Sequence, residues 1–188
     1  MYNIIKHYFR NINTFNQSTI SMLAVNFRSF RKKLSYYRKA YRSFLSKTEK
    51  NPPAGIDKLT PIIAMEVWEE VDCLSCANCC KKMTPTFTKQ DLKRISAHFN
   101  QTPEAFTKQW LEKDKNKDMV NVNQPCQFLN LTDNMCSIYE IRPVDCAGFP
   151  HLSKKKWVEY AHVHKQNIDY CPATLKMVEK MIQRVSKV

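Results

Sequence analysis

Glycine is nearly absent from this sequence: of 188 residues, only Gly55 and Gly148 are glycine. The phosphate-binding loop of nucleotide hydrolases and the dinucleotide-binding fingerprint both need several glycines at fixed spacing. Neither motif is present, so we do not expect chemistry driven by a bound nucleotide. The sequence also shows no internal repeat and no low-complexity tract.

Long apolar stretches are absent as well. Residues 1–25 contain Lys6 and Arg10 but no uninterrupted apolar segment of the kind found in secretory signal peptides. Nothing downstream approaches the roughly 18 apolar residues that span a bilayer. We therefore expect a cytoplasmic protein without a transmembrane segment, in which thiols stay reduced.

Acidic residues are scarce in the N-terminal part of the chain. Residues 1–50 hold eleven Lys and Arg against the single acid Glu49, so this part carries most of the net charge of +13. Apolar residues at steps of three and four predict an amphipathic basic helix over 27–45. Such a helix can dock on its own domain with its cations in solvent, which we favour, or bind nucleic acid or an anionic membrane.

Residues 51–55 (Asn-Pro-Pro-Ala-Gly) predict a break after this helix, because consecutive prolines disfavour helix and glycine permits a turn. We expect a basic helical arm at 1–50, a linker at 51–55 and a domain at 56–188. Residues 1–21 are weakly patterned, so we expect disorder there, with Met22 as a second candidate start.

Cysteine is abundant by contrast. The segment 73–80 (Cys-Leu-Ser-Cys-Ala-Asn-Cys-Cys) holds four of the chain's eight cysteines. Each C-x2-C step can deliver two sulfurs to a tetrahedral zinc ion or to an iron–sulfur cluster. Neighbours such as Cys79 and Cys80 rarely both find disulfide geometry nearby, and a reducing compartment disfavours disulfides, so we expect a metal centre rather than a disulfide framework. The predicted ligands are Cys73, Cys76, Cys79, Cys80, Cys126, Cys136, Cys146 and Cys171.

The number of centres stays open, because eight thiolates can form two four-thiolate sites or one site with further cysteines beside it. If 73–80 were one helix, its four sulfurs would share one face. Cys171 precedes a predicted helix beginning at Pro172, where the helix dipole favours thiolate. Cys146 is followed by Gly148, whose small size lets backbone amides approach the sulfur.

Two helices are predicted from their N-terminal signals. Thr88 and Asp91 form a capping box that opens a helix over 88–99. Thr102 is the expected N-cap of the next helix, with Pro103 at its first position. We interpret both as packing elements rather than as sites.

The following segment is predicted to be irregular. Short apolar runs separated by polar turns over 119–136 predict a small hairpin or two short strands, with Cys126 and Cys136 on the two arms. Pro143 limits any helix to about one turn on either side. The resulting fold class is α+β, mainly α: a small, irregular, metal-centred domain with a short β-hairpin and an N-terminal basic helix.

Other polar residues are weaker candidates. His162 and His164 would present two imidazoles on one strand face, but a solvated or hydrogen-bonded pair is favoured over a metal site because thiolates are in surplus. Tyr139, Arg142 and Asp145 are candidates for a polar pocket beside the cysteines. The alternative for Arg142 is that it anchors a carboxylate or backbone carbonyls.

Taken in order, the cysteine motifs resemble the YkgJ-like CxxCxxCC cysteine-cluster family. The resemblance covers roughly residues 68–175, with Ala77 where a glycine is frequent and Ala147 where a basic residue is common. It rests on Cys73-x2-Cys76-x2-Cys79-Cys80, Cys126-x-Phe128-Leu129, Cys136-x-Ile138-Tyr139-x2-Arg142-Pro143-x2-Cys146-x2-Phe149-Pro150 and Cys171-Pro172.

The family is described as zinc- or iron-chelating, and a similar domain occurs in flagellin lysine N-methylase, where an iron–sulfur cluster is implicated. The resemblance therefore implies an iron–sulfur cluster, of the 4Fe–4S type, or zinc. Two functions follow: a redox or protein-modification accessory that works with another protein, or a structural zinc-binding interaction module without catalytic activity. No module for S-adenosylmethionine is recognisable, so enzymatic activity is left undecided.

Overall fold

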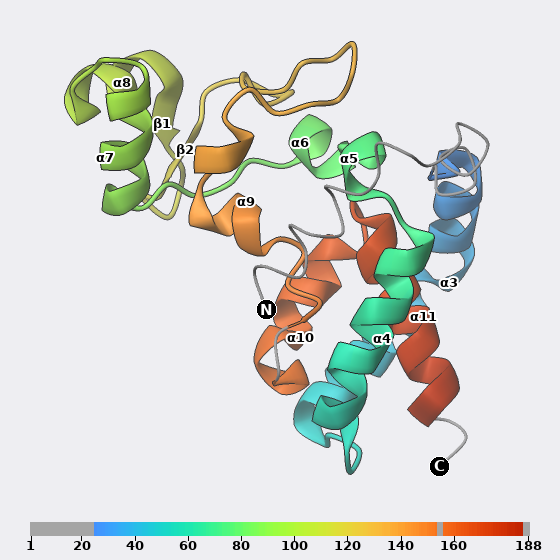
Figure 1. Cartoon of the computed structure of the whole chain (residues 1–188). Coiled ribbons are helices and arrows are strands. Elements are labelled where there is room, and N and C mark those ends of the chain that lie inside the picture. Colours follow the sequence, from blue (N-terminus) through green and yellow to red (C-terminus); the bar gives the residue numbers. More distant parts are fainter. Residues whose placement is uncertain (1–24, 154–155, 186–188) are drawn as a thin grey trace.

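The computed structural model describes residues 25–153 and 156–185, so the expectations for residues 1–21 lie outside the described residues. A group of four long helices and a smaller helix–hairpin group lie on either side of a cysteine-rich junction (Figure 1). The long helices are α3 (Phe27–Lys50), α4 (Ile56–Glu70), α10 (Trp157–Asn167) and α11 (Pro172–Val185). The protein is thus mainly α, as predicted.

The basic helix α3 packs into the core of the four-helix group. It begins after Asn26, whose side chain accepts a hydrogen bond from the Ser29 N–H at 2.9 Å. Leu45 is fully buried in the same core as residues of α4, α10 and α11. The indole of Trp157 on α10 donates to Thr48 Oγ1 at 3.0 Å. This packing is the one expected of a helix docked on its own chain, while the domain division at residues 51–55 stays a prediction.

The second group is built from α7 (Lys89–His98), α8 (Pro103–Trp110) and two short strands. Thr88 and Asp91 form the predicted capping box, and Thr102 caps α8 with its side-chain oxygen, so both predicted helix starts are confirmed. Phe106 and Phe128 stack with ring centroids 6.2 Å apart in the core of this group. Local capping signals therefore placed these helices correctly.

The hairpin lies earlier in the chain than predicted. Strands β1 (Leu111–Lys113) and β2 (Met119–Asn121) pair antiparallel, with Glu112 opposite Val120. The predicted partner segment instead forms one isolated bridge between Leu129 and Cys136. The short β-hairpin of the predicted fold class is confirmed, but its predicted position was wrong, because β1 has a charged sequence that continues directly from α8 and so conceals a strand in a single sequence.

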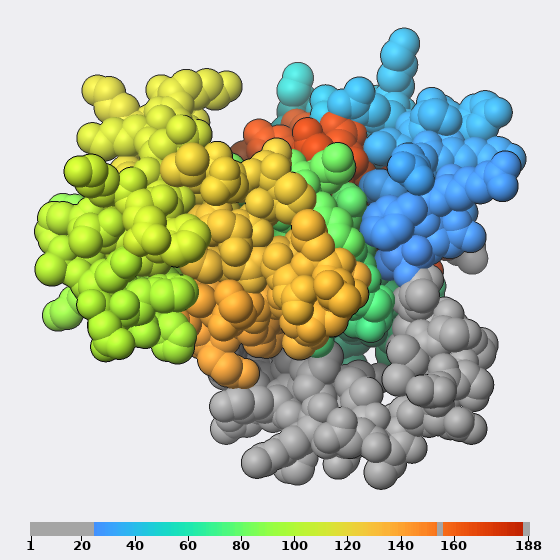
Figure 2. Space-filling view, turned by 90° about the horizontal axis from the view of Figure 1, so that it is seen from above, coloured from blue at the N-terminus to red at the C-terminus, as the bar shows by residue number. Residues whose placement is uncertain are grey.

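Between the two groups lie four very short helices: α5 (Cys73–Cys76), α6 (Asn78–Lys82), the 3-10 helix η2 (Tyr139–Ile141) and α9 (Val144–Gly148). Pro143 separates the last two, as its restriction on helix length predicted. Seen from above, the yellow-to-orange part of the chain fills the surface between the α7–α8 group and α3 (Figure 2). The cysteines are carried by these short elements and the loops around them.

Candidate metal centre

The four cysteines of residues 73–80 are carried by two helices rather than one. Ala77 takes the left-handed conformation, with φ of 45°, and separates α5 from α6. Its N–H still bonds to the Cys73 carbonyl at 3.1 Å, which closes α5. The condition of one continuous helix over 73–80 is therefore not met. The turn at Ala77 sets the direction of α6, which carries Cys79 and Cys80.

Four of the cysteines, which we call the Cys171 set, line one narrow cavity of about 10 Å³ whose wall also includes Phe149 and Tyr170. The amide of Asn78 donates to the Tyr170 carbonyl at 2.6 Å and so holds α6 against the start of α11. Cys171 stands immediately before α11, as predicted, and its sulfur accepts a hydrogen bond from the Thr174 N–H at 3.5 Å. The Cys171 set consists of Cys73, Cys76, Cys79 and Cys171.

The other four cysteines, the Cys126 set, lie toward the α7–α8 group. The Cys126 N–H bonds to the Cys80 carbonyl at 2.9 Å, and the Asn121 amide donates to the Cys126 sulfur at 3.3 Å. Cys126 and Cys136 both pack against the core of the α7–α8 group, and Cys146 lies on α9. The Cys126 set consists of Cys80, Cys126, Cys136 and Cys146.

Helix α9 carries Cys146. Hydrogen bonds hold this helix to α7 and to the segment that precedes α7. The buried Asp91 carboxylate accepts from the Val144 N–H at 3.2 Å and from the Arg94 guanidinium at 2.6 Å. Arg94 also donates to the Arg142 carbonyl at 3.0 Å, and Asp145 accepts from the Thr86 N–H at 3.0 Å. The sequence signalled Asp91 only as a helix cap, so its second role in positioning α9 was missed.

The model of the CxxCxxCC family, described as "Putative zinc- or iron-chelating domain", matches residues 72–172, more than half of the chain. The chain belongs to this family. The matched range contains all eight cysteines and so agrees with the resemblance found in the sequence. Comparisons with curated proteins and with solved structures find no match.

Burial controls the acidity of most of these thiols in this member of the CxxCxxCC family. Burial raises the pKa of Cys76 to about 11. Cys73 is an exposed residue, but the burial of its thiol together with the neighbouring thiols raises its pKa to about 12. Burial also raises the pKa of Cys171, outweighing the hydrogen bonds from Thr174 at the start of α11. Metal binding at these positions must therefore displace protons.

Cys79 and Cys80 differ from the rest because their sulfurs share a hydrogen bond at 3.8 Å. This bond lowers the pKa of the accepting thiol and raises the pKa of the donating one. A thiolate at Cys80 would also raise the pKa of the neighbouring thiols, which are Cys73, Cys126, Cys136 and Cys146.

The donor chemistry fits the metals that the family description names, since thiolates suit both zinc and iron–sulfur clusters. Within residues 25–153 and 156–185, no three His, Cys, Asp or Glu side chains lie close enough to hold a single ion. Binding one ion would therefore require thiol side chains to turn toward it.

Among the same residues, no helix has the length and apolarity needed to cross a membrane.

The other polar residues singled out in the sequence are not grouped with the cysteines as possible metal ligands. His162 and His164 lie on helix α10 rather than on a strand, with His162 exposed and His164 buried, so the expected shared face was wrong. Arg142 donates to the Tyr139 carbonyl, and its guanidinium carbon lies 3.8 Å from the centre of the Tyr139 ring, which is the anchoring alternative. Gly148 leaves room for the His151 imidazole, which a Cβ there would approach to 3.0 Å.

Proposed function

We propose that the protein holds an iron–sulfur cluster of the 4Fe–4S type through its cysteine thiolates and serves as a cytoplasmic redox or protein-modification accessory of another protein. The observation that carries this proposal is the convergence of thiols from α5, α6, α9, the segment 126–136 and the start of α11 on one junction. Thiolates are the ligands that such clusters use. The bound cluster would supply one-electron chemistry.

Hydrogen bonds to sulfur support the redox part of the proposal. The Thr174 N–H donates to Cys171, and the Asn121 amide donates to Cys126. Hydrogen bonds of this kind tune the reduction potential of a cluster and orient its ligands. A purely structural ion does not change its oxidation state and needs no particular reduction potential. Removal of these two donors should therefore shift the reduction potential of the bound cluster.

The alternative is a structural zinc-binding interaction module without catalytic activity. One observation favours it. The cavity of the Cys171 set, about 10 Å³, has the size of a single water or ion.

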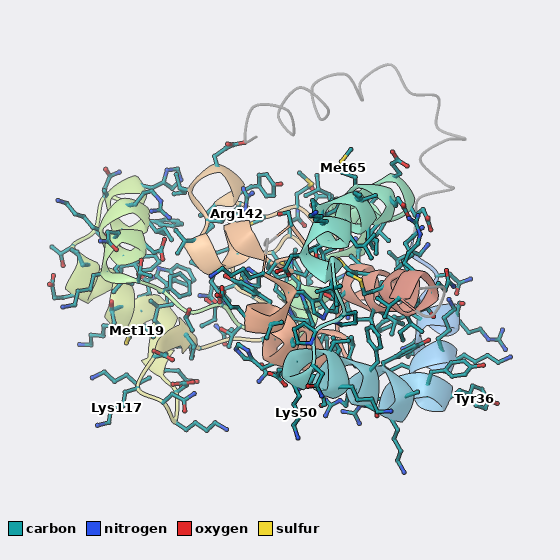
Figure 3. All side chains as sticks on the ribbon, turned by 90° about the horizontal axis from the view of Figure 1, so that it is seen from below. Tyr36, Lys50, Met65, Lys117, Met119 and Arg142 are labelled. Carbon is teal, nitrogen blue, oxygen red and sulfur yellow. The ribbon has the colours of Figure 1, made fainter. Side chains whose placement is uncertain are left out.

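Another protein is the partner that we propose, ahead of nucleic acid or an anionic membrane. Several cations of α3 are occupied within the chain: Lys33 pairs with Glu179 at 2.8 Å, and Arg38 and Arg42 pair with Asp169. Tyr36, 72% exposed, projects from the same helix into solvent (Figure 3). Steeply salt-dependent binding of DNA, RNA or anionic vesicles would contradict this preference.

The decisive experiment is anaerobic reconstitution of the full chain with iron and sulfide. We expect a brown protein whose visible absorbance is bleached by dithionite, with iron and sulfide in equal amounts. Cys76→Ser should lower both, whereas Ser75→Ala, at the exposed neighbour in the same turn, should not. A colourless protein that retains zinc under these conditions would overturn the iron–sulfur proposal in favour of the structural module.

A further inference from the structure

The narrow cavity at the start of α11 is lined by four thiols that come from three elements. Cys73 and Cys76 come from α5, Cys79 from α6 and Cys171 from the residue before α11. Cys80 is not part of this wall. Four is the usual number of ligands of a structural zinc ion or of a thiolate-bound cluster, so the four cysteines of this wall would complete one site once their side chains turned toward a single ion. The Cys171 set therefore needs no fifth cysteine.

The remaining thiols are attached to the opposite group of elements. Cys171 belongs to the core of the four-helix group, whereas Cys126 and Cys136 pack against the core of the α7–α8 group. Cys146 is held on that side as well, because α9 is fixed to Asp91 of α7. Cys126, Cys136 and Cys146 are thus attached to one group of elements and Cys171 to the other.

Cys80 joins the Cys126 set although it follows Cys79 directly. Successive residues on a helix point about 100° apart, so neighbours can face different sites. The Cys80 carbonyl is bound by the Cys126 N–H at 2.9 Å, which places its backbone beside the second set. A pair of adjacent cysteines at the boundary is therefore suited to serve two sites, one residue each.

We propose that the eight cysteines form two separate four-thiolate centres, the Cys171 set holding one and the Cys126 set the other. This inference rests on the proposed metal-binding function and adds to it the number of centres and the ligands of each. It holds whether the physiological metal is iron or zinc. Zn²⁺ is the appropriate probe because it accepts any set of four thiolates.

The test compares variants that each lack two cysteines, taken from one set or from both. The full chain is reduced, stripped of metal anaerobically, titrated with Zn²⁺ and desalted, and zinc per chain is measured. We expect two zinc ions in the native chain and one each in Cys76→Ala/Cys171→Ala and Cys126→Ala/Cys146→Ala. The matched cross-set variant Cys76→Ala/Cys126→Ala, with the same number of thiols, leaves three ligands in each set, so it should still take up two zinc ions, both bound more weakly than in the native chain.

Thiol labelling shows which residues hold the remaining ion. In zinc-loaded Cys76→Ala/Cys171→Ala, N-ethylmaleimide should modify Cys73 and Cys79 while the Cys126 set stays protected. In the native chain at half saturation, intact-mass analysis should show chains with four labels, and peptide mapping should place them within one set. This measurement needs no substitution and decides the matter if a variant fails to fold.

The two proposals fail in different ways. A native chain that takes up neither zinc nor iron overturns the metal-binding function and the two centres together. A native chain that binds one zinc ion, or that loses all zinc in either same-set variant while still folded, overturns the two centres alone. Chains that carry a number of labels other than none, four or eight at half saturation would do the same.

Discussion

The sulfurs of Cys79 and Cys80 lie 3.8 Å apart, yet the two residues contact different segments of the chain. Cys79 lines the cavity at the start of α11, and the backbone of Cys80 is bound by Cys126. Both depend on the turn at Ala77, which ends α5 and starts α6. The backbone conformation of this one residue therefore sets the direction of the thiols that follow it.

Replacing Ala77 by glycine should stabilise the protein. A non-glycine residue in the left-handed region costs roughly 1–2 kcal/mol, part of which is offset by the greater freedom of glycine in the unfolded chain and by the lost buried methyl group. We expect Ala77→Gly to gain about 0.5 kcal/mol in the free energy of unfolding, measured with urea on metal-free, reduced protein.

The matched control is Ala97→Gly, at an exposed position inside helix α7. Glycine there should cost about 1 kcal/mol, because the helical backbone favours alanine. An equal loss in both variants would show that the conformation at Ala77 carries no strain.

Local signals in the sequence predicted what local interactions determine. Thr88 with Asp91 and Thr102 with Pro103 marked two helix starts, because capping involves residues only a few positions apart. The spacing of aromatic residues predicted α3 for the same reason. Cysteine spacing also identified the thiols that converge, since the ligand chemistry depends on residue type.

Contacts between distant segments were not predictable in this way. The bond from Asn78 to Tyr170 joins positions 92 residues apart, and the bond from Val144 to Asp91 joins positions 53 apart. Neither residue type nor spacing specifies such a partner in a single sequence. The proposed division of the cysteines into two sets depends on these contacts, which is why the sequence alone leaves the number of centres open.

Neutralising Asp91 should destabilise the junction. This carboxylate is fully buried and binds Thr88, Arg94 and the Val144 N–H; burial alone would raise its pKa, but these bonds hold the pKa below its usual value. Asp91→Asn leaves the Arg94 charge without its partner, so we expect a loss of about 2 kcal/mol in the free energy of unfolding.

The same variant should expose Cys146, because α9 loses its attachment to α7. Faster labelling of that thiol in metal-free protein would be the specific readout. Glu104→Gln, at an exposed position in the first turn of α8, is the control and should change stability by less than about 0.5 kcal/mol. If Asp91→Asn behaved like the control, the carboxylate would not be what holds α9.

Stability should fall on mild acidification because of His164. Burial lowers the pKa of this imidazole to about 4, and the ring lies 5.1 Å from that of Trp157 in the core of the four-helix group. The unfolded state binds the proton more readily than the folded state does. The contribution of neutral His164 to the free energy of unfolding is therefore complete above about pH 6.5 and declines as the pH falls toward 4. The full loss is about 3 kcal/mol, at ~1.4 kcal/mol per pKa unit.

His164→Gln should flatten this acid limb when unfolding free energy is measured between pH 4 and 7, whatever its effect at neutral pH. His162→Gln, on the exposed face of the same helix, should retain the native slope. The same slope in the native chain and in both variants would mean that His164 is not the group being titrated.

Metal removal should act on the junction before it acts on the helical core. The helices α5 and α6 span only 4 and 5 residues, far below the ~12–15 residues that an isolated helix needs, so they depend on tertiary contacts, to which a metal bound by their cysteines would add. Helix α4, in contrast, buries Ile63 and Val67 in the core of the four-helix group. A ligand at about 1,000 times its Kd adds roughly 4 kcal/mol to the free energy of unfolding, so stripping the metal should lower Tm by about 10 °C.

Hydrogen exchange should show protection lost first over residues 73–82 and retained over 56–70. Equal loss in both segments, or an unchanged Tm after complete removal of metal, would show that the thiols do not stabilise the fold through a bound metal.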